Sequence, residues 1–294
     1  MKKILITGGT GFIGKQIIRK CLENGLDYLS CGVDVTSEDE HSRFCDITDI
    51  ESVKSVISAY MPDGIIHLAA IAAPVHKDVS QIYKVNVLGT ENMLSAAAEL
   101  LPQKTRFILI STAGVYGNQE TEKYNEELNF NPVNHYSCSK MVTEIISRQY
   151  KDRLNISIVR PFNIIGAGQV STFLVPKLVK AFSEKQPELV LGNLKAIRDF
   201  VPCELCAETM LKLCLCEENA PDVLNICSGV GHSCEDVIKT LEDITGHHPN
   251  IVSTSEFIRQ NEIWRMVGDP TRLSEFLGYD VSKDYLREVL VSML

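Results

Sequence analysis

The sequence predicts an α/β fold, a doubly wound parallel sheet with a smaller second domain. In the first half of the chain, short apolar runs of strand length alternate with longer runs of helix length, which is the order of βαβ units in a parallel sheet. A glycine-rich turn at residues 8–14 joins the first strand-like run to the first helix-like run. After Pro161 the alternation gives way to loops that carry glycine, proline and asparagine, which indicates a part of different construction.

The expected elements follow from the apolar pattern in chain order. The run KILIT predicts a strand at residues 3–7, and the residues after the glycine turn predict a helix at 11–24. The further elements of the first half are expected as strand 28–34, helix 50–60, buried strand 64–69, long helix 79–100, strand 106–111 (RFILIS), helix 136–151 and strand 156–160.

The second domain is expected to be discontinuous. The late run DVLNIC, residues 222–227, is apolar enough to return to the main sheet. We therefore expect a first domain at 1–160, to which 200–228 returns, and a second domain at 161–199 and 229–294.

The composition limits the possible partners. The formal net charge of −9 and the pI near 5.3 argue against a nucleic-acid or membrane-surface protein, because no basic field is present to hold phosphates. Two lysines precede apolar residues at the N-terminus, but the glycines from Gly8 onward interrupt that run far short of a signal sequence or a membrane span. We expect a cytoplasmic protein.

Ten cysteines are scattered along the chain. In a chain of this length without a secretory segment, cysteines are more often reduced than paired. The set Cys203, Cys206, Cys214 and Cys216 has spacings that a zinc site could use. However, Cys203, Cys206, Met210 and Cys214 also fall at helical spacing, which is typical of a buried apolar stripe. We favour the stripe and expect no metal.

The stretch TGGTGFIG follows the first predicted strand and opens the first helix, with Gly8, Gly11 and Gly14 at three-residue spacing. Glycines let the backbone turn tightly and approach a pyrophosphate, and the helix N-terminus supplies unpaired N–H donors, so the stretch predicts a Rossmann-type dinucleotide site. Asp34 follows twenty residues after Gly14. A carboxylate at the end of the second strand binds the adenosine ribose and repels a 2′-phosphate, which favours NAD. NADP stays open because Arg43 is close in sequence.

The stretch NHYSCSK sets Tyr136 four residues before Lys140. Residues four apart on a helix lie on one face, about 5–6 Å from each other. A neighbouring cation favours the phenolate and lowers the pKa of a tyrosine, which prepares it for proton transfer. A lone YxxxK more often has a packed tyrosine and a solvated lysine.

With TGxxGxxG and YxxxK in one chain, the sequence resembles the extended short-chain dehydrogenases/reductases of the NAD-dependent epimerase/dehydratase group from end to end. The stretch CDITD resembles the family's adenine-contacting loop, and HLAA resembles the strand end that lines the cofactor. The stretch VNVLGT resembles the segment that carries the helix asparagine, and STAGVYG resembles the stretch that carries the catalytic hydroxyl. The resemblance implies cofactor contacts from Gly8, Gly11, Phe12, Ile13, Gly14, Asp34, Asp46, Ile47, Leu68, Ala69, Ala70, Asn86, Tyr136, Lys140 and Pro161. For Asn86 a structural cap is an equal alternative.

Two further observations narrow the resemblance. RPFNIIGAGQ, residues 160–169, is similar to the RPFNHIGPGQ of GDP-4-keto-6-deoxymannose reductases, and GNL, RDF and NICSG echo the same subgroup, although Ile164 and Ala167 depart from the motif. Sugar 4,6-dehydratases carry Asp-Glu directly after the catalytic threonine, where this chain has Ala113 and Gly114. Without that acid and base, elimination of water is not expected.

The resemblance implies NAD(P)H-dependent reduction of the 4-keto group of a nucleotide-activated 4-keto-6-deoxyhexose, with 1–160 as the cofactor domain and the second domain for the substrate. Tyr136 would donate the proton, Lys140 would lower the pKa of Tyr136 and bind the nicotinamide ribose, and Thr112 would hydrogen-bond the ketone oxygen. Substrate contacts are implied for Thr112, Asn163, Gln169, Phe173, Arg198 and Arg259. The two arginines are expected at the diphosphate, which a guanidinium binds well.

Two other functions stay open at this stage. A nucleotide-sugar 4-epimerase with tightly bound NAD uses the same Thr-Tyr-Lys set. A non-catalytic dinucleotide sensor keeps the fold, but it need not keep that set. The resemblance also implies a homodimer formed through the helices at 79–100 and 140–150.

Overall fold

The computed structural model describes residues 2–35, 37–72, 78–254 and 262–294. The chain forms two compact units, each described here by itself. Unit 1 comprises Met1–Val115, Phe130–Arg160 and Cys206–Leu224, and unit 2 comprises Tyr116–Asn129, Pro161–Leu205 and Asn225–Leu294. Within the described ranges, no helix combines the length and the apolar character that are needed to cross a bilayer.

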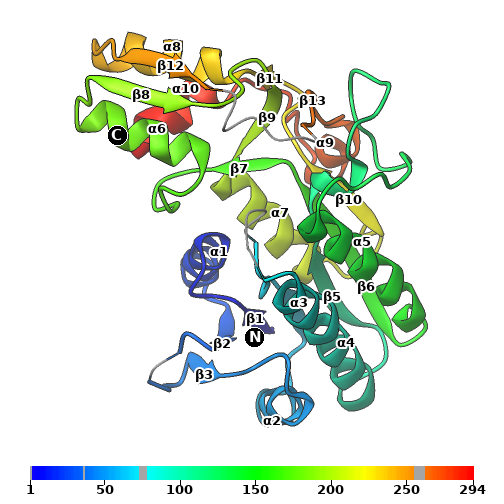
Figure 1. The fold of residues 1–294 in the computed structure, drawn as a ribbon. Coiled ribbons are helices and arrows are strands. Elements are labelled where there is room, and N and C mark those ends of the chain that lie inside the picture. The colour runs from blue at the N-terminus through cyan, green and yellow to red at the C-terminus, as the bar shows by residue number, and fades with distance from the viewer. Residues whose placement is uncertain (1, 36, 73–77, 255–261) are drawn as a thin grey trace. The chain divides into compact units, whose positions relative to one another are not determined.

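Unit 1 is built on a seven-stranded sheet in the order β10-β6-β5-β4-β1-β2-β3 (Figure 1). The pairs from β6 to β3 are all parallel. The strands are β1 (Lys3–Thr7), β2 (Asp27–Gly32), β3 (Ser42–Phe44), β4 (Gly64–His67), β5 (Thr105–Ile110), β6 (Leu154–Pro161) and β10 (Val223–Ile226). The predicted α/β class, with a doubly wound parallel sheet, is confirmed.

Helices lie on both faces of this sheet, because its strands are apolar on both sides. One row of side chains crosses five strands in register and packs under α2 (Ile50–Tyr60) and α4 (Gly89–Leu100). The row consists of Leu29, Leu5, Ile65, Phe107 and Ile156. On the other face, a Cβ placed on Gly64 would come within 2.6 Å of Cys214 Sγ on α7 (Cys203–Leu215).

Unit 1 has further helices, several of which carry candidate site residues. They are α1 (Phe12–Glu23), α3 (Val79–Tyr83), η1 (Lys84–Leu88), α5 (His135–Ser147) and the short 3₁₀ turns η2 (Ala113–Tyr116) and η3 (Arg148–Tyr150). Figure 1 shows α4 and α5 side by side.

Most predicted elements are confirmed within a few residues, and the departures have local causes. The strand expected at 28–34 ends at Gly32, so that Val33 and Asp34 form the turn after it. The long helix expected at 79–100 is interrupted by the π-helical turn η1. The sequence analysis missed β3, which has only three residues and little apolar character. The late strand does return to the main sheet as β10.

The cysteine-containing segment forms α7, as its helical spacing predicted. Cys203, Cys206, Met210 and Cys214 are all buried. They are therefore part of the packed interior, and all ten cysteines are free thiols.

Unit 2 contains two small sheets and a helical layer. One sheet has the order β11-β9-β13 with β7 paired to β9, and the other pairs β12 with β8. Its elements are β7 (Asn163–Ile165), α6 (Leu174–Ser183), β8 (Glu188–Leu191), β9 (Ile197–Pro202), β11 (Gly231–His232), α8 (Cys234–Thr245), β12 (Asn250–Ser253), β13 (Arg265–Met266), α9 (Thr271–Leu277) and α10 (Leu286–Met293). Side chains of α6, α8 and α10 form its core.

The buried carboxylate of Asp199 organises the loops of unit 2. It accepts hydrogen bonds from the backbone N–H groups of Ser228, Gly229 and Gly268 at 2.9, 2.9 and 3.1 Å, and from the Ser228 hydroxyl at 2.6 Å. Burial raises the pKa of Asp199, while these hydrogen bonds oppose the rise. Unit 2 also includes the segment Tyr116–Asn129, which was expected in the first domain at 1–160. Tyr124 explains this, because its hydroxyl donates to the Arg265 carbonyl at 2.7 Å and its own carbonyl accepts from Asn225.

Candidate active site

The glycine-rich turn joins β1 to α1 in a tight backbone cradle. The Gly8 N–H donates to the Cys31 carbonyl at 2.8 Å, and the Gly11 N–H donates to the Gly8 carbonyl at 3.1 Å. A Cβ on Gly14 would lie only 2.5 Å from the Gly8 carbonyl oxygen, so a side chain there would push the turn apart. The N-cap of α1 is Gly11, and no acidic side chain occupies the first turn. The N–H groups of this turn can therefore hold an anion such as a pyrophosphate.

The other predicted cofactor residues of unit 1 lie at or just beyond the carboxyl ends of the strands. Asp34 is exposed, two residues beyond the end of β2. Asp46 is engaged locally, because its Oδ1 accepts from both N and Oγ1 of Thr48 at 2.9 Å. Leu68 and Ala69 bind Thr7, the last residue of β1, through their backbone N–H groups. Ligands of open α/β sheets bind at this end of the strands.

Asn86 is buried inside the π-helical turn η1 and connects two parts of unit 1. Its Oδ1 accepts from the Ile71 N–H at 2.8 Å, and its Nδ2 donates to Ser139 Oγ on α5 at 3.0 Å. Ser139 in turn donates to the Tyr136 carbonyl at 2.7 Å. The π-helical turn therefore places an amide between the strand-end loop and the helix that carries Tyr136, and such turns are often found at functional sites.

Thr112 and Tyr136 lie close together in unit 1. Thr112 follows the end of β5, and Tyr136 is the second residue of α5, whose N-cap Asn134 accepts from the Ser137 N–H at 2.8 Å. The Thr112 hydroxyl lies close enough to the phenol to lower the pKa of Tyr136. The expected lowering of the pKa of Tyr136 is wrong for this structure. Burial raises that pKa to about 12, and the Thr112 hydroxyl only partly opposes the rise.

Lys140 lies one turn after Tyr136 and is 2% exposed. Its Nζ donates to the Ile110 carbonyl at the end of β5, at 3.0 Å. Burial lowers the pKa of Lys140 to about 8, and the negative charge of Glu144 opposes that fall. The ammonium is thus held at the strand end beside Thr112.

The position after Ala113 leaves no room for an acidic side chain. A Cβ on Gly114 would come within 2.5 Å of Ser137 Oγ and within 3.3 Å of Thr112 Oγ1. Gly114 and the buried Ala113 therefore let α5 approach Thr112 closely. These two small residues stand where elimination of water requires an acid and a base.

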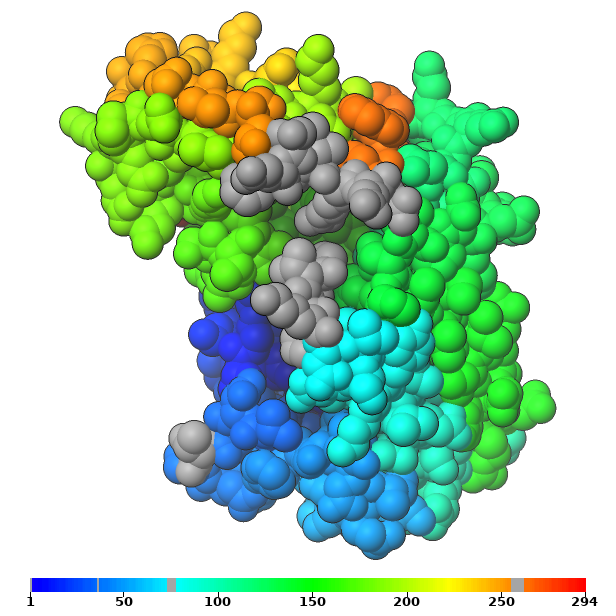
Figure 2. Space-filling view, in the orientation of Figure 1, coloured from blue at the N-terminus to red at the C-terminus, as the bar shows by residue number. Residues whose placement is uncertain are grey.

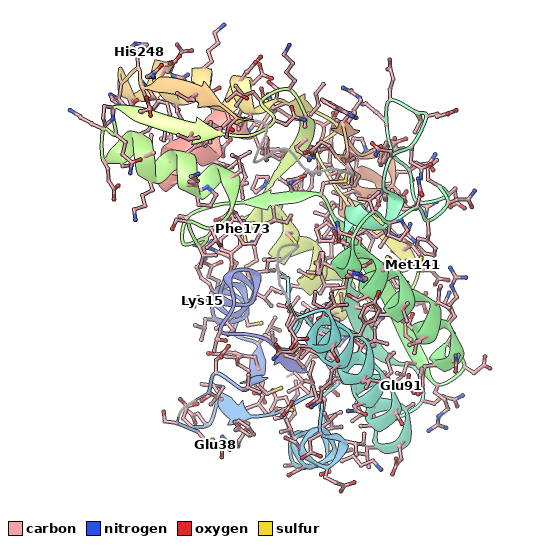
Figure 3. The ribbon with its side chains drawn as sticks, viewed as in Figure 1. Lys15, Glu38, Glu91, Met141, Phe173 and His248 are labelled. Carbon is pink, nitrogen blue, oxygen red and sulfur yellow. The ribbon has the colours of Figure 1, made fainter. Side chains whose placement is uncertain are left out.

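Apart from Thr112 in unit 1, the predicted substrate residues that the structure describes lie in unit 2. Asn163 is on β7, and Gln169 follows in a loop where its Nε2 donates to the Ile164 carbonyl at 3.0 Å. Within the described part of the chain, Asn163 Oδ1 and Gln169 Oε1 are buried without a hydrogen-bond partner, which suits side chains that meet a polar ligand. Phe173 is exposed at the N-cap of α6, in the loop where Figure 3 labels it. Arg259 lies outside the described residues.

Arg198 on β9 has an acidic partner. Its Nη2 lies 2.8 Å from Glu262 Oε1, and the two side chains are 17% and 12% exposed. Asn118 accepts from the Trp264 N–H and donates to the Glu262 carbonyl, which holds this segment in place. This pairing was not predicted, because the two residues are 64 positions apart in the sequence.

Two buried charges beside the candidate catalytic residues were not predicted. Glu144 lies four residues after Lys140, on the same face of α5, and its carboxylate pairs with Arg160 at 2.7 Å. The signal was present in the sequence, because a third residue at helical spacing continues the Tyr136–Lys140 face.

Comparison with known proteins agrees with this geometry. Residues 4–227 match the NAD dependent epimerase/dehydratase family. The chain is 38% identical over 291 residues to a GDP-6-deoxy-D-talose 4-dehydrogenase of Aggregatibacter actinomycetemcomitans, covering 99% of this chain and 96% of that one. It is 27% identical to a GDP-6-deoxy-D-mannose reductase of Pseudomonas aeruginosa, covering 98% and 96%. The structure of RMD from Pseudomonas aeruginosa complexed with NADPH superposes with a TM-score of 0.84 at 26% identity, covering 99% and 97%.

Proposed function

The chain belongs to the NAD dependent epimerase/dehydratase family, and from this premise we propose that it interconverts a 4-keto and a 4-hydroxy group on a nucleotide-activated 6-deoxyhexose. The observation that carries the proposal is that Thr112, Tyr136 and the buried Lys140 meet at the end of β5, where the Lys140 ammonium donates to the Ile110 carbonyl. Two relatives support the proposal, one named as a 4-dehydrogenase and the other as a reductase. Oxidation of a secondary alcohol and reduction of the matching ketone are one reaction in opposite directions.

The raised pKa of Tyr136 favours the reductive direction. With a pKa of about 12 the phenol stays protonated at neutral pH, so it can donate a proton to the oxygen of a carbonyl that is being reduced. The Thr112 hydroxyl can hydrogen-bond the same oxygen and stabilise its developing negative charge. A bound nicotinamide supplies the hydride chemistry. In the oxidative direction Tyr136 must first lose its proton, which burial disfavours.

The cofactor proposal is NAD or NADP, with NAD preferred. The glycine cradle fits the pyrophosphate of either form, and Asp34 provides a carboxylate where a 2′-phosphate would be repelled. We propose that Lys140 binds the nicotinamide ribose. Pro161, at the end of β6, is a further proposed contact.

The test is a substrate panel. Purified protein is mixed with GDP-, dTDP- or CDP-4-keto-6-deoxyhexoses and NADH or NADPH, and the absorbance of the reduced cofactor is followed. The reverse reaction uses the matching 6-deoxyhexoses with NAD or NADP. Stoichiometric consumption of reduced cofactor with one ketone supports the proposal and names the nucleotide. No consumption, together with NAD that copurifies with the protein and exchange of C4 configuration, would assign a 4-epimerase instead.

We propose that Arg198 binds the substrate diphosphate. Replacing Arg198 by methionine is expected to raise KM for the sugar nucleotide about 10-fold or more, because a charge-assisted hydrogen bond is lost and the Glu262 carboxylate is left to repel the phosphates. The measurement is KM and kcat at several cofactor concentrations. Arg287, an exposed arginine on α10, is the matched control, and its methionine variant should keep the wild-type KM. An unchanged KM in Arg198→Met would show that Arg198 does not bind the substrate.

We also propose a homodimer formed through α4, η1 and α5. Leu88 on η1 and Ile145 on α5 are 57% and 44% exposed, although both are large apolar side chains. In Figure 2 the surface of residues 80–100 (cyan) continues into that of α5 (green). An apolar face on neighbouring helices suits a four-helix interface. Light scattering should give twice the chain mass of 32.7 kDa for the wild type and a single chain mass for Leu88→Glu/Ile145→Glu.

A further inference from the structure

The carboxylate of Glu144 is buried between three elements of unit 1. The side chain is 1% exposed and that of its partner Arg160 is 4% exposed. Arg160 Nη2 donates to Oε2 at 2.7 Å and Arg160 Nε donates to Oε1 at 3.0 Å, while the Ser111 hydroxyl also donates to Oε1. The ring of Phe130 lies 5.1 Å from the Arg160 guanidinium. A buried carboxylate with this many donors is held in one position.

Each of these partners is next to a residue of the candidate active site. Ser111 lies between Ile110, whose carbonyl accepts a hydrogen bond from the Lys140 ammonium, and Thr112, whose hydroxyl lowers the pKa of Tyr136. The Ser111 N–H also donates to the Val159 carbonyl on β6 at 2.7 Å. Arg160 directly precedes Pro161. One carboxylate on α5 therefore ties the ends of β5 and β6 to the helix that carries Tyr136 and Lys140.

The charges around Lys140 identify Glu144 as its counter-ion. On α5, the neighbours on its face are Tyr136, which stays neutral, and Glu144. On β4, burial and the charge of Lys140 lower the pKa of His67 to about 3, so the imidazole is neutral at working pH. β5 ends with the Ile110 carbonyl, and the Ser111 hydroxyl follows it. β6 contains the positively charged Arg160, which is paired with Glu144. The negative charge of Glu144 opposes the desolvation of Lys140.

We propose that Glu144 is a positioning residue of the active site, which sets Thr112 and Tyr136 through Ser111 and supplies the negative charge that keeps Lys140 an ammonium. The role in turnover rests on the proposed function. The charge on Lys140 does not depend on the proposed function, because that charge can be measured without substrate.

The first test is therefore a direct titration of Lys140. Protein labelled with [ε-13C]lysine is titrated by NMR, and the Lys140 resonance is assigned by its loss in Lys140→Met. In Glu144→Gln the titration midpoint is expected to fall by about one pH unit from that of the wild type, because the opposite charge is lost while the shape is kept. Glu126→Gln is the matched control, since Glu126 is another buried glutamate with an arginine neighbour, in unit 2. The midpoint should not move in that variant.

The second test separates charge from geometry. Ser111→Ala keeps every charge and removes one tether, so we expect an unchanged Lys140 midpoint and a kcat that is about tenfold lower with KM close to wild type. Glu144→Asp keeps the charge on a shorter side chain, so its midpoint should return toward that of the wild type. In Glu144→Gln the alkaline limb of the pH–rate profile should move to lower pH with the NMR midpoint, because the ammonium is lost earlier.

The outcomes distinguish the two proposals. A Lys140 midpoint that is the same in folded Glu144→Gln and in the wild type overturns the role of Glu144, whatever the substrate panel gives. If Glu144→Gln does not fold, Glu144→Asp and Ser111→Ala carry the test, and wild-type turnover in both overturns the positioning role. A shifted midpoint with no turnover of any sugar nucleotide by the wild type overturns the proposed function and leaves the counter-ion role standing.

Discussion

Replacing Tyr136 by phenylalanine is expected to lower kcat by about 10²–10⁴-fold and to leave the binding of cofactor and sugar nucleotide close to wild type. The phenol is the acid of the proposed reaction, and Tyr136 is the second residue of α5. Its hydroxyl interacts with the neutral Thr112 hydroxyl, so its loss leaves no buried charge unpaired. The measurement is steady-state turnover of the ketone with reduced cofactor, together with a fluorescence titration of cofactor binding.

Tyr150 provides the matched control for this variant. It lies in η3, beyond α5, and its hydroxyl is half-buried and bonded to Glu91, which Figure 3 labels on α4. Tyr150→Phe removes the same atom outside the proposed site and should keep kcat within about a factor of two of the wild type. Near-normal turnover in Tyr136→Phe would mean that the proton comes from another group.

Replacing Arg160 by methionine is expected to lower the free energy of unfolding by about 3–5 kcal/mol. The variant leaves the Glu144 carboxylate, 1% exposed, without its guanidinium partner. An uncompensated buried charge costs far more than the net value of the original pair. The double variant Arg160→Met/Glu144→Gln should recover most of the loss, because neither charge then remains buried. Urea unfolding followed by circular dichroism measures all three differences.

The control for the ion pair is Arg19 on α1, which pairs with Glu23 at 3.5 Å with both side chains about half exposed. Exposed helical pairs contribute about 0.3–0.5 kcal/mol, so Arg19→Met should change the unfolding free energy by less than about 1 kcal/mol. Equal effects in Arg160→Met and Arg19→Met would show that water reaches Glu144 in solution.

Several features of this protein were readable without coordinates because they depend on residues close in sequence. The glycine turn needs only its own backbone and the helix it opens, and the face shared by Tyr136 and Lys140 needs only the helical repeat. Strand and helix order followed from local apolar patterns. The same reasoning failed for β3 and for the π-helical turn at Asn86. β3 has only three residues, two of them polar, so it carries little apolar signal. The turn depends on the Asn86 amide reaching Ile71 and Ser139, which are 15 and 53 residues away in the sequence.

The electrostatics of the site were decided by tertiary structure alone. The sequence placed an ammonium beside a phenol and so predicted a lowered pKa for Tyr136. Folding instead buries Lys140 and partly buries Tyr136, and desolvation outweighs the neighbouring interactions. Spacing could not show that Glu144 meets Arg160 and Ser111, or that Arg198 meets Glu262, because each contact joins segments from different elements. The sequence by itself determined the fold class and the glycine turn, and it suggested the proposed catalytic set, since those are local patterns. Only the packed structure determined which charges are buried and what each one faces, since burial and long-range contact exist only after the chain has folded.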